Sequence, residues 1–335
     1  MCGKINTMDK YIRQIFLIDA DSKIPNLALM KLSAYHKSIG DNVILHRLNM
    51  PYYPNKKKRA YDVPVYAYDK TYCSVIFEGN KDFIRGDGIV FGGTGACLRT
   101  KLQDEIENME PDYSIYPDNN MSYGFISRGC IRKCTFCKVP EKEGMIHQVS
   151  TPEQIVKHKK VTFLDNNILA LPGHEKILKD IVNMGIKCDF NQGLDIRLLT
   201  EENSMLLFKL DYIGEYVFAF DDWKYRNIID EKLRLLNWRR DWGLKFFVYC
   251  DPKKSISEIV NRIEFLKERK CLPYIMRDIS CWKDTKNEFY VDVAAWCNQP
   301  GFFKNMSFDQ FLNTRHPKNK NRVDKSFKIY NSKKT

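Results

Sequence analysis

The sequence predicts an α/β protein with a small doubly wound domain over residues 1–105 and a partial barrel over residues 121–300. Three observations carry this prediction. Apolar strand-like runs alternate with helical stretches in both regions, the second region holds six such repeats, and each of its strands ends at polar side chains. A polar, proline-containing linker is expected over residues 106–120, and residues 301–335 form a C-terminal extension with a basic tail.

The first domain is predicted to hold four strands and one clear helix. Pro25 suits the first turn of a helix and Gly40 suits its end. Leu27, Met30 and Leu32 give this helix an apolar face. The strands are expected at residues 14–20, 43–48, 73–77 and 88–91. Because strands and helices alternate, we expect a parallel sheet with helices on both faces.

The second domain is predicted to repeat a strand and a helix six times. The strands are expected at residues 123–126, 161–164, 186–190, 216–220, 245–249 and 274–276. The helices are expected at residues 152–159, 174–184, 201–210, 224–242 and 255–269. Six repeats are too few for a closed eight-stranded barrel and suit an open, three-quarter one.

Polar residues stand where each predicted strand of the second domain ends. The sets are the cysteine loop, Asp165-Asn166-Asn167, residues 191–197, Asp221-Asp222, Cys250-Asp251 and Arg277-Asp278. In parallel βα barrels the chemistry sits on the loops at the carboxyl ends of the strands. One rim is therefore expected to collect carboxylates, amides and two arginines around the cysteine loop.

Three cysteines, Cys130, Cys134 and Cys137, share that loop at a C-x3-C-x2-C spacing. Thiolates are ligands for zinc and for iron–sulfur clusters. Three thiolates on a cube of four irons leave one iron without a protein ligand, and an open position at a metal centre is where a reactant binds. The alternatives are a zinc knuckle with a distant fourth ligand and three unrelated cysteines. A zinc knuckle would not need the ring of polar residues.

This spacing, with Phe136 directly before the third cysteine, resembles the signature of the radical S-adenosylmethionine (radical SAM) superfamily. The resemblance implies a (β/α)6 partial TIM barrel and a [4Fe–4S] cluster held by the three cysteines. It implies that the open iron chelates the amino and carboxylate groups of SAM. It also implies one-electron cleavage of the SAM sulfonium to a 5′-deoxyadenosyl radical, with flavodoxin or ferredoxin as the kind of electron donor.

The same resemblance, with the groups that SAM presents, assigns roles to strand-end residues. Asp165, Asn166 and Asn167 offer acceptors for the ammonium group. Family members often carry Gly-Gly-Glu at this place, so Asp-Asn-Asn departs from the common motif. The ribose hydroxyls and the carboxylate are assigned to Gln192, Asp195 and Arg197, because an arginine can bind a carboxylate with two hydrogen bonds.

The adenine of SAM is assigned to an apolar slot. Phe218, Ala219 and Phe220 on the fourth strand supply it, with the backbone of Phe136 nearby. The alternative for Phe218 and Phe220 is packing in the barrel core, since side chains alternate along a strand. The alternative for Asp195 and Arg197 is a structural ion pair.

The first domain resembles the cobalamin-binding-like domain that precedes many radical SAM cores, through residues 24–30 and the loop Gly92-Gly93-Thr94-Gly95. The cobalamin-binding Asp-x-His-x-x-Gly loop of that family would fall at residues 19–23, which contain no histidine. We therefore expect a Rossmann-like domain without cobalamin, and a corrinoid bound without that histidine is the alternative. The glycine loop itself is also compatible with a simple tight turn.

Composition sets the class and compartment. A hydrophobic fraction of 44% supports substantial cores, and no apolar run approaches the ~20 residues of a membrane span. Eleven cysteines without a secretory signal argue for the reducing cytoplasm. Residues 301–335 hold nine Lys/Arg and two Asp/Glu, more than half of the net charge of +12. This tail is either a phosphate-binding arm or a solvated, poorly ordered end.

We therefore expect a cytoplasmic radical SAM enzyme. Its basic charge favours a nucleic acid, a nucleotide or a phosphorylated substrate over a neutral metabolite, and a peptide substrate is the alternative. The rivals are a cobalamin-dependent radical SAM methyltransferase and a non-catalytic, metal-stapled nucleic-acid-binding protein. A methylthiotransferase is disfavoured, because the chain has no second ordered cysteine triplet for an auxiliary cluster.

Overall fold

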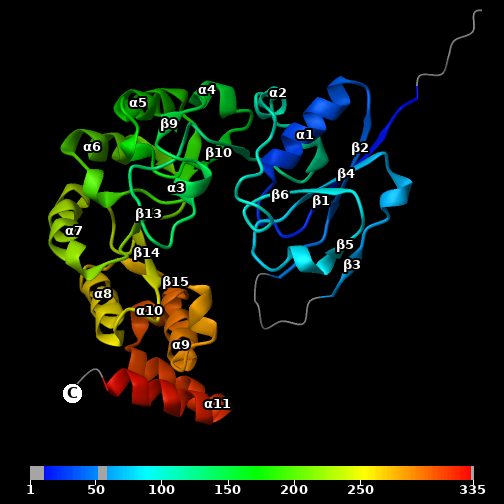
Figure 1. The fold of residues 1–335 in the computed structure, drawn as a ribbon. Helices are drawn as coiled ribbons and strands as arrows, with labels where there is room; N and C mark the ends of the chain where they lie inside the picture. The colour runs from blue at the N-terminus through cyan, green and yellow to red at the C-terminus, as the bar shows by residue number, and fades with distance from the viewer. Residues whose placement is uncertain (1–10, 52–58, 333–335) are drawn as a thin grey trace, which may run out of the picture. The chain divides into compact units, whose positions relative to one another are not determined.

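A computed structural model describes residues 11–51 and 59–332. Their contacts divide into two compact units (Figure 1). The first consists of residues 11–51, 59–120 and 136–142, and the second of residues 121–135 and 143–332. Both units contain parallel sheets and α-helices, so the predicted α/β class is confirmed.

The first unit is built on a four-stranded parallel sheet with the order β2-β1-β4-β6. Its strands are β1 (Gln14–Asp19), β2 (Asn42–Arg47), β4 (Lys70–Ser74) and β6 (Ile89–Gly92). The four predicted strands are therefore confirmed, each within a few residues of its expected bounds. The central strand β1 is almost wholly buried, as its apolar sequence requires.

The two faces of this sheet are covered differently. Ile15 and Leu17 of β1 pack against α1 (Leu27–Ser38) and α2 (Asp104–Glu107). The opposite face packs on β3 (Tyr61–Asp62) and β5 (Ile84–Arg85), through buried Val63 and Ile84. The expectation of helices on both faces is therefore wrong for the described residues. The chain between β4 and β6 is rich in glycine and polar residues, and it forms turns, a short 3-10 helix (Lys81–Phe83) and strand β5 in place of an α-helix.

The segment expected as a linker folds onto the first unit. Ile106 is buried against the α1 face, and Ile115 packs on the same cluster. Lys31 of α1 pairs with Glu107 at 2.8 Å, and the Ser33 hydroxyl donates to Asp112 at 2.6 Å. Ile106 and Ile115, two apolar residues in an otherwise polar segment, could have predicted this packing from the sequence.

The second unit contains two sheets in which every strand pair is parallel. The first has the order β12-β11-β10-β7 and the second the order β13-β14-β15. The strands are β7 (Ser122–Gly124), β10 (Lys160–Phe163), β11 (Lys187–Phe190), β12 (Asp211–Tyr212), β13 (Tyr216–Ala219), β14 (Leu244–Cys250) and β15 (Leu272–Arg277). An isolated parallel bridge joins Leu194, beyond the end of β11, to Phe218 of β13. The six predicted strands are confirmed, and β12 is additional.

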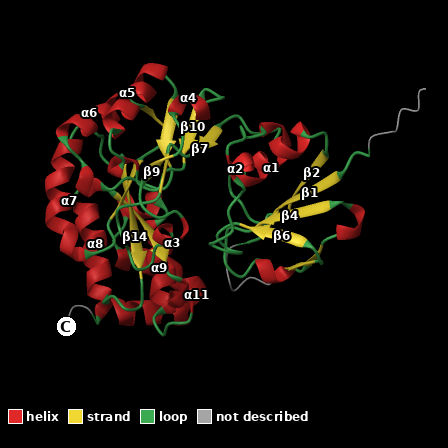
Figure 2. Ribbon diagram, turned by 45° about the horizontal axis from the view of Figure 1, so that its top comes forward, coloured by secondary structure: helices red, strands yellow, loops and turns green. Residues whose placement is uncertain are grey.

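Helices follow these strands as the alternation predicted, but the helices predicted over residues 152–159 and 224–242 are shorter than expected, and the second continues as a 3-10 helix over residues 234–236. The helices are α4 (Pro152–Ile155), α5 (His174–Met184), α6 (Glu201–Lys209), α7 (Arg226–Leu233) and α8 (Ile256–Glu268). Helices α5 to α8 lie in an arc along one side of the strands (Figure 2). Local signals fix their starts: Thr200 caps α6 by accepting from Asn203 N, and Ser255 caps α8 by accepting from Glu258 N.

The C-terminal segment is helical and packed on the second unit, so the expectation of a poorly ordered end is wrong for its described residues. It forms α9 (Asn287–Cys297), α10 (Pro300–Asn305) and α11 (Phe308–Asn331). The carboxylate of Asp292 on α9 is fully buried. It accepts from Ser326 Oγ at 2.7 Å and lies 3.1 Å from a guanidinium nitrogen of Arg322, both on α11. Part of the positive charge of the tail is therefore neutralised inside the fold.

No helix among the described residues combines the length and the apolar character needed to cross a bilayer.

Candidate functional site

The cysteine loop leaves β7 through a short antiparallel pair, in which β8 (Ser127–Arg128) lies against β9 (His147–Gln148). Gly129 connects β8 to Cys130 with a φ of +83°. A Cβ atom at this position would lie 2.4 Å from the carbonyl oxygen of Met145. The loop therefore depends on glycine both for its left-handed backbone and for its close approach to the neighbouring chain.

Gly129→Ala is expected to disorder the loop, because the added methyl meets backbone that cannot move aside. Gly144→Ala is the matched control, because Gly144 has a φ of +74° and open space around its Cβ position. This variant should lose only about 1–2 kcal/mol, which is what a left-handed backbone costs a residue with a Cβ atom. Thermal unfolding of the two variants checks this. Equal melting temperatures would contradict the steric account.

The cysteine sulfurs receive hydrogen bonds from N–H groups. Cys130 Sγ accepts from Arg132 N at 3.3 Å and from Asn167 Nδ2 at 3.4 Å. Within the 136–142 segment of the first unit, Cys137 Sγ accepts from Val139 N at 3.5 Å. Such donors stabilise thiolates and tune iron–sulfur clusters. The donor set therefore fits the implied cluster chemically.

The described residues contain no group of three or more His, Cys, Asp or Glu side chains arranged to hold a metal ion. Cys130 and Cys134 are half-buried and Cys137 is exposed. The loop thus offers accessible thiols of the chemistry that an iron–sulfur cluster requires.

Asp165, directly after β10, is 1% exposed and holds the start of the cysteine loop. One carboxylate oxygen accepts from Ser127 N at 2.5 Å and from Ser127 Oγ at 2.6 Å, and the other accepts from Ile126 N at 3.2 Å. Burial raises the pKa of Asp165 to about 6, although the hydrogen bonds from Ser127 and Ile126 favour the charged form. Asp165 was predicted to bind the SAM ammonium, but in this structure its oxygens are used to position the loop.

The two asparagines after Asp165 also reach the cysteine loop. Asn166 Oδ1 accepts from Gly129 N at 3.0 Å, and Asn167 Nδ2 donates to Cys130 Sγ. Asn167 is 3% exposed, and its Oδ1 has no hydrogen-bond partner within the described part of the chain. A buried carbonyl oxygen without a donor calls for an explanation, and a bound donor is one.

The loop after β11 joins the same assembly through an ion-pair cluster. Asp195 accepts from Arg132 Nε at 2.8 Å and from Arg197 Nε at 2.7 Å. Burial alone would raise the pKa of Asp195, but the hydrogen bonds from Arg197 and Arg132 outweigh it and hold the pKa below its usual value. The guanidinium of Arg197 also lies 4.5 Å from the ring centroid of Tyr225. Gln192 of the same loop is exposed.

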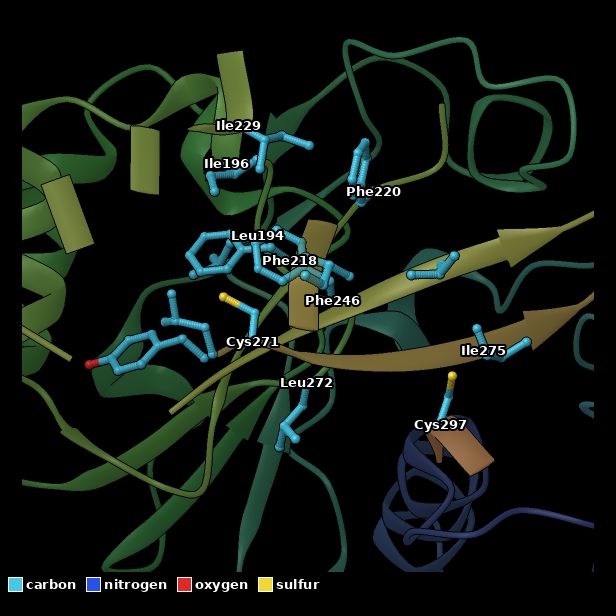
Figure 3. Close-up of a cluster of buried hydrophobic side chains, with 14 of the residues drawn as sticks. Leu194, Ile196, Phe218, Phe220, Ile229, Phe246, Cys271, Leu272, Ile275 and Cys297 are labelled. Carbon is cyan, nitrogen blue, oxygen red and sulfur yellow. The ribbon is translucent and has the colours of Figure 1, made fainter. Parts of the chain in front are cut away.

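Phe218 and Phe220, which were assigned to an adenine slot, are fully buried, as the alternative of core packing expects. Phe218 lies 5.6 Å from Phe246 on the neighbouring strand, and Phe220 lies 5.4 Å from Phe265 on α8, measured between ring centroids. Figure 3 shows Phe218 beside Leu194 and Phe246 in the core. Strand alternation turns both rings toward the core and leaves Ala219 exposed. Phe136, in the 136–142 segment of the first unit, is 38% exposed.

Sequence reasoning missed a buried arginine beneath the ends of β13 and β14. Arg262 of α8 is 0% exposed and donates to Phe220 O at 2.8 Å and to Tyr249 O at 3.1 Å. Tyr249 N donates to Asp221 Oδ1 at 3.3 Å, and burial raises the pKa of Asp221. Arg262 thus caps strand-end carbonyls. Its position on the apolar face of a predicted helix was the available signal.

Four cysteines of the second unit outside the loop are core residues. Cys250, Cys271, Cys281 and Cys297 are each at most 2% exposed. Burial raises the pKa of the thiols of Cys250, Cys271 and Cys281 to about 12 and raises that of Cys297 as well. Buried, protonated thiols are unreactive, so these four serve as packing.

In the first unit, the loops at the carboxyl edge of the sheet bind one another. Asp21 accepts from Ile76 N at 2.8 Å and from Asn80 Nδ2 at 2.7 Å, and Asp19 accepts from Ser22 N at 3.0 Å. In the glycine loop, Cβ atoms at Gly93 and Gly95 would lie 2.3 and 2.5 Å from the backbone of residues 75–77. The glycines are needed for this loop-to-loop packing.

No protein-family model matches the chain, and a search of curated proteins found no relative.

Proposed function

We propose that the chain is a radical SAM enzyme and that its second unit is a partial (β/α)6 barrel. The parallel strands β7, β10 and β11 neighbour one another in chain order in one sheet, and β13, β14 and β15 do so in the other, which supports this. Leu194 N donates to Val217 O at 2.7 Å, which continues the pairing from the first sheet to the second. In such a barrel the carboxyl ends of all six strands surround one mouth.

The observation that carries the proposal is the convergence of two strand-end loops, those after β10 and β11, on the cysteine loop. Asp165 holds its start, Asn166 and Asn167 reach Gly129 and Cys130, and Asp195 reaches Arg132. A three-cysteine loop that served only as a structural zinc knuckle would not need carboxylates and amides from two other strands. The arrangement suits a cluster site with an adjoining polar ligand.

Each residue has a proposed role. Cys130, Cys134 and Cys137 would hold a [4Fe–4S] cluster, which supplies the electron that cleaves SAM when both are bound. Asn167 Oδ1 accepts a hydrogen bond from the SAM ammonium. Gln192 and Arg197 bind its ribose and carboxylate, while Asp195 fixes the two arginines. Asp165 and Asn166 are positioning residues that set the path of the loop.

Asn167→Ala is expected to weaken SAM binding about tenfold, because a hydrogen bond to a charged group contributes about 1.5–3 kcal/mol. The KM for SAM should rise while the iron content stays that of the parent protein. Asn227→Ala, on the exposed side of α7, is the matched control and should leave KM unchanged. An unaltered KM in Asn167→Ala would remove this asparagine from the site.

The reaction class is tested by anaerobic reconstitution of the cluster, followed by incubation with dithionite and SAM. We expect 5′-deoxyadenosine, read by mass spectrometry. Zinc at one ion per chain, with no iron and no cleavage product, would instead favour a metal-stapled binding protein. This assay reports the reaction class independently of the substrate.

We also propose that the enzyme works without cobalamin in its first unit. Residues 19–23 lack the histidine of a cobalamin loop. Asp19 accepts a hydrogen bond within its own loop, from Ser22 N, and Asp21 accepts one from Ile76 N of the neighbouring loop. The visible spectrum of protein purified with cobalamin present checks this, because a retained corrinoid absorbs differently from an iron–sulfur cluster. The net charge of +12 supports a nucleic acid, a nucleotide or another phosphorylated molecule as the substrate.

A further inference from the structure

We propose that a pocket at the amino-terminal edge of β14 and β15 is a binding site for the phosphate groups of a nucleotide-sized ligand. This inference goes beyond the proposed function and does not depend on it. Leu244 and Cys271, at the starts of these two strands, line the pocket. Because all strands of the two main sheets are parallel, the pocket lies at the opposite edge of the unit from the cysteine loop.

The pocket has the size and charge of a phosphate site. It encloses about 370 Å³, at the lower end of the range of small-molecule pockets. Five cations line it against two carboxylates. They are Arg234, Arg239, Arg240, Arg269 and Lys270, against Asp230 and Asp241. Guanidinium groups match phosphate oxygens with paired hydrogen bonds.

Three of these cations remain available. Arg269 pairs with Asp230 and Lys270 pairs with Asp241, each at 2.6 Å. Within the described part of the chain, Arg234, Arg239 and Arg240 have no carboxylate partner. The positive charge of these three arginines is not neutralised by carboxylates of the described residues, so a bound anion could neutralise it.

Arg239 is held in place by aromatic rings, although one of its hydrogen-bond donors has no acceptor among the described residues. Its guanidinium carbon lies 4.7 Å from the ring centroid of Tyr216 and 5.5 Å from that of Trp238. Its Nε is buried and has no hydrogen-bond partner among the described residues, and its Nη2 makes only a 3.4 Å contact with Gly243 O. Arg239 therefore has a fixed guanidinium and a buried N–H donor without a hydrogen-bond partner among the described residues. This combination is expected of a ligand-binding arginine and not of an arginine on the open surface.

The backbone around the pocket is strained as functional loops often are. Among the described residues, only Asn49, Trp242 and Lys270 are non-glycine residues with positive φ, and the last two flank this pocket. Trp242 N donates to Lys270 O at 2.7 Å, which ties the two strained positions together. The loop before β14 and the loop before β15 are thereby locked around the cavity.

The test is calorimetric binding of inorganic phosphate, ADP and a short single-stranded RNA to the full chain at fixed ionic strength. We expect ADP to bind more tightly than phosphate. The exposed pair R234Q/R240Q should weaken ADP binding about tenfold or more without disturbing the core, and Arg239→Gln should do the same. RNA that binds more tightly than ADP, with the same loss in the variants, would place the phosphates on a polynucleotide backbone.

The control removes the same charge elsewhere. K179Q/K209Q takes two exposed lysines from α5 and α6 and should leave ADP binding within about twofold. Equal weakening in both double variants, or no binding of any of the three probes by the parent chain, would overturn the proposal. Binding is measured without reductant or SAM, so failure here and failure of SAM cleavage are separate results.

Discussion

Replacing Cys130, Cys134 and Cys137 together by alanine is expected to abolish both the iron–sulfur cluster and SAM cleavage. Thiolates supply the ligands that bind iron–sulfur clusters, and each cysteine would carry one iron of the cube. The measurement is iron and sulfide content after anaerobic reconstitution, with 5′-deoxyadenosine formation in the same samples. Both should fall to the level of protein that was never reconstituted.

The control for this variant is Cys97→Ala, because Cys97 is an exposed cysteine of the first unit outside the loop. It should retain iron, sulfide and cleavage at the level of the parent chain. Single replacements of the three loop cysteines should each lose stable cluster binding. An unchanged iron content in the triple variant would refute the ligand assignment outright.

Removing the Asp165 carboxylate is expected to produce the largest loss of stability in the site. In Asp165→Ala, the N–H groups of Ile126 and Ser127 lose their buried acceptor, at about 1–3 kcal/mol for each unsatisfied group. The free energy of unfolding, from urea titration, measures the loss. Asp211→Asn, whose carboxylate lies 3.6 Å from Lys187 on the surface, is the control and should cost less than about 1 kcal/mol. Similar losses in the two variants would contradict the role of Asp165.

The pH dependence of Asp165 has a definite sign. Burial raises its pKa from 3.8 to about 6, so the folded carboxyl binds a proton more tightly than the unfolded one. This contribution to stability is present below about pH 4 and decreases as the pH rises to about 6, by about 3 kcal/mol in all. Asp165→Asn should lack that decrease, so its deficit relative to the parent should be largest near pH 4. A deficit that grows above pH 6 would show that the charged form is the favoured one.

The sequence predicted the strands, and it predicted the meeting of two polar strand ends, those of β10 and β11, with the cysteine loop, for a physical reason. A strand buried on both faces must be apolar, and a polar run must end it, so both appear in the local composition. Parallel strands then bring those ends to one edge, which is why Asp165, Asn166 and Asp195 could be placed near the cysteine loop from spacing alone.

What local composition did not predict was the partner of each side chain. The sequence predicted Asp165 as a ligand-binding carboxylate, but its oxygens accept hydrogen bonds from the backbone at the start of the cysteine loop. Strand alternation shows that Phe218 and Phe220 lie on the same face of the sheet, but it does not show which face is the core. In the structure, both side chains point into the core. Arg262 looked like an ordinary helix arginine until the carbonyls of Phe220 and Tyr249 were found beside it. The tail packs on the second unit through apolar side chains such as Phe311 and Val323, with Arg322 paired to Asp292 of another helix.

The central claim is that three cysteines hold an iron cube whose fourth iron binds SAM. Electron paramagnetic resonance of the reduced, reconstituted protein tests this most directly, with metal analysis of the same sample. We expect about four irons per chain and a cluster signal that changes when SAM is added. A signal that SAM leaves unchanged, or one zinc per chain in place of iron, would contradict it.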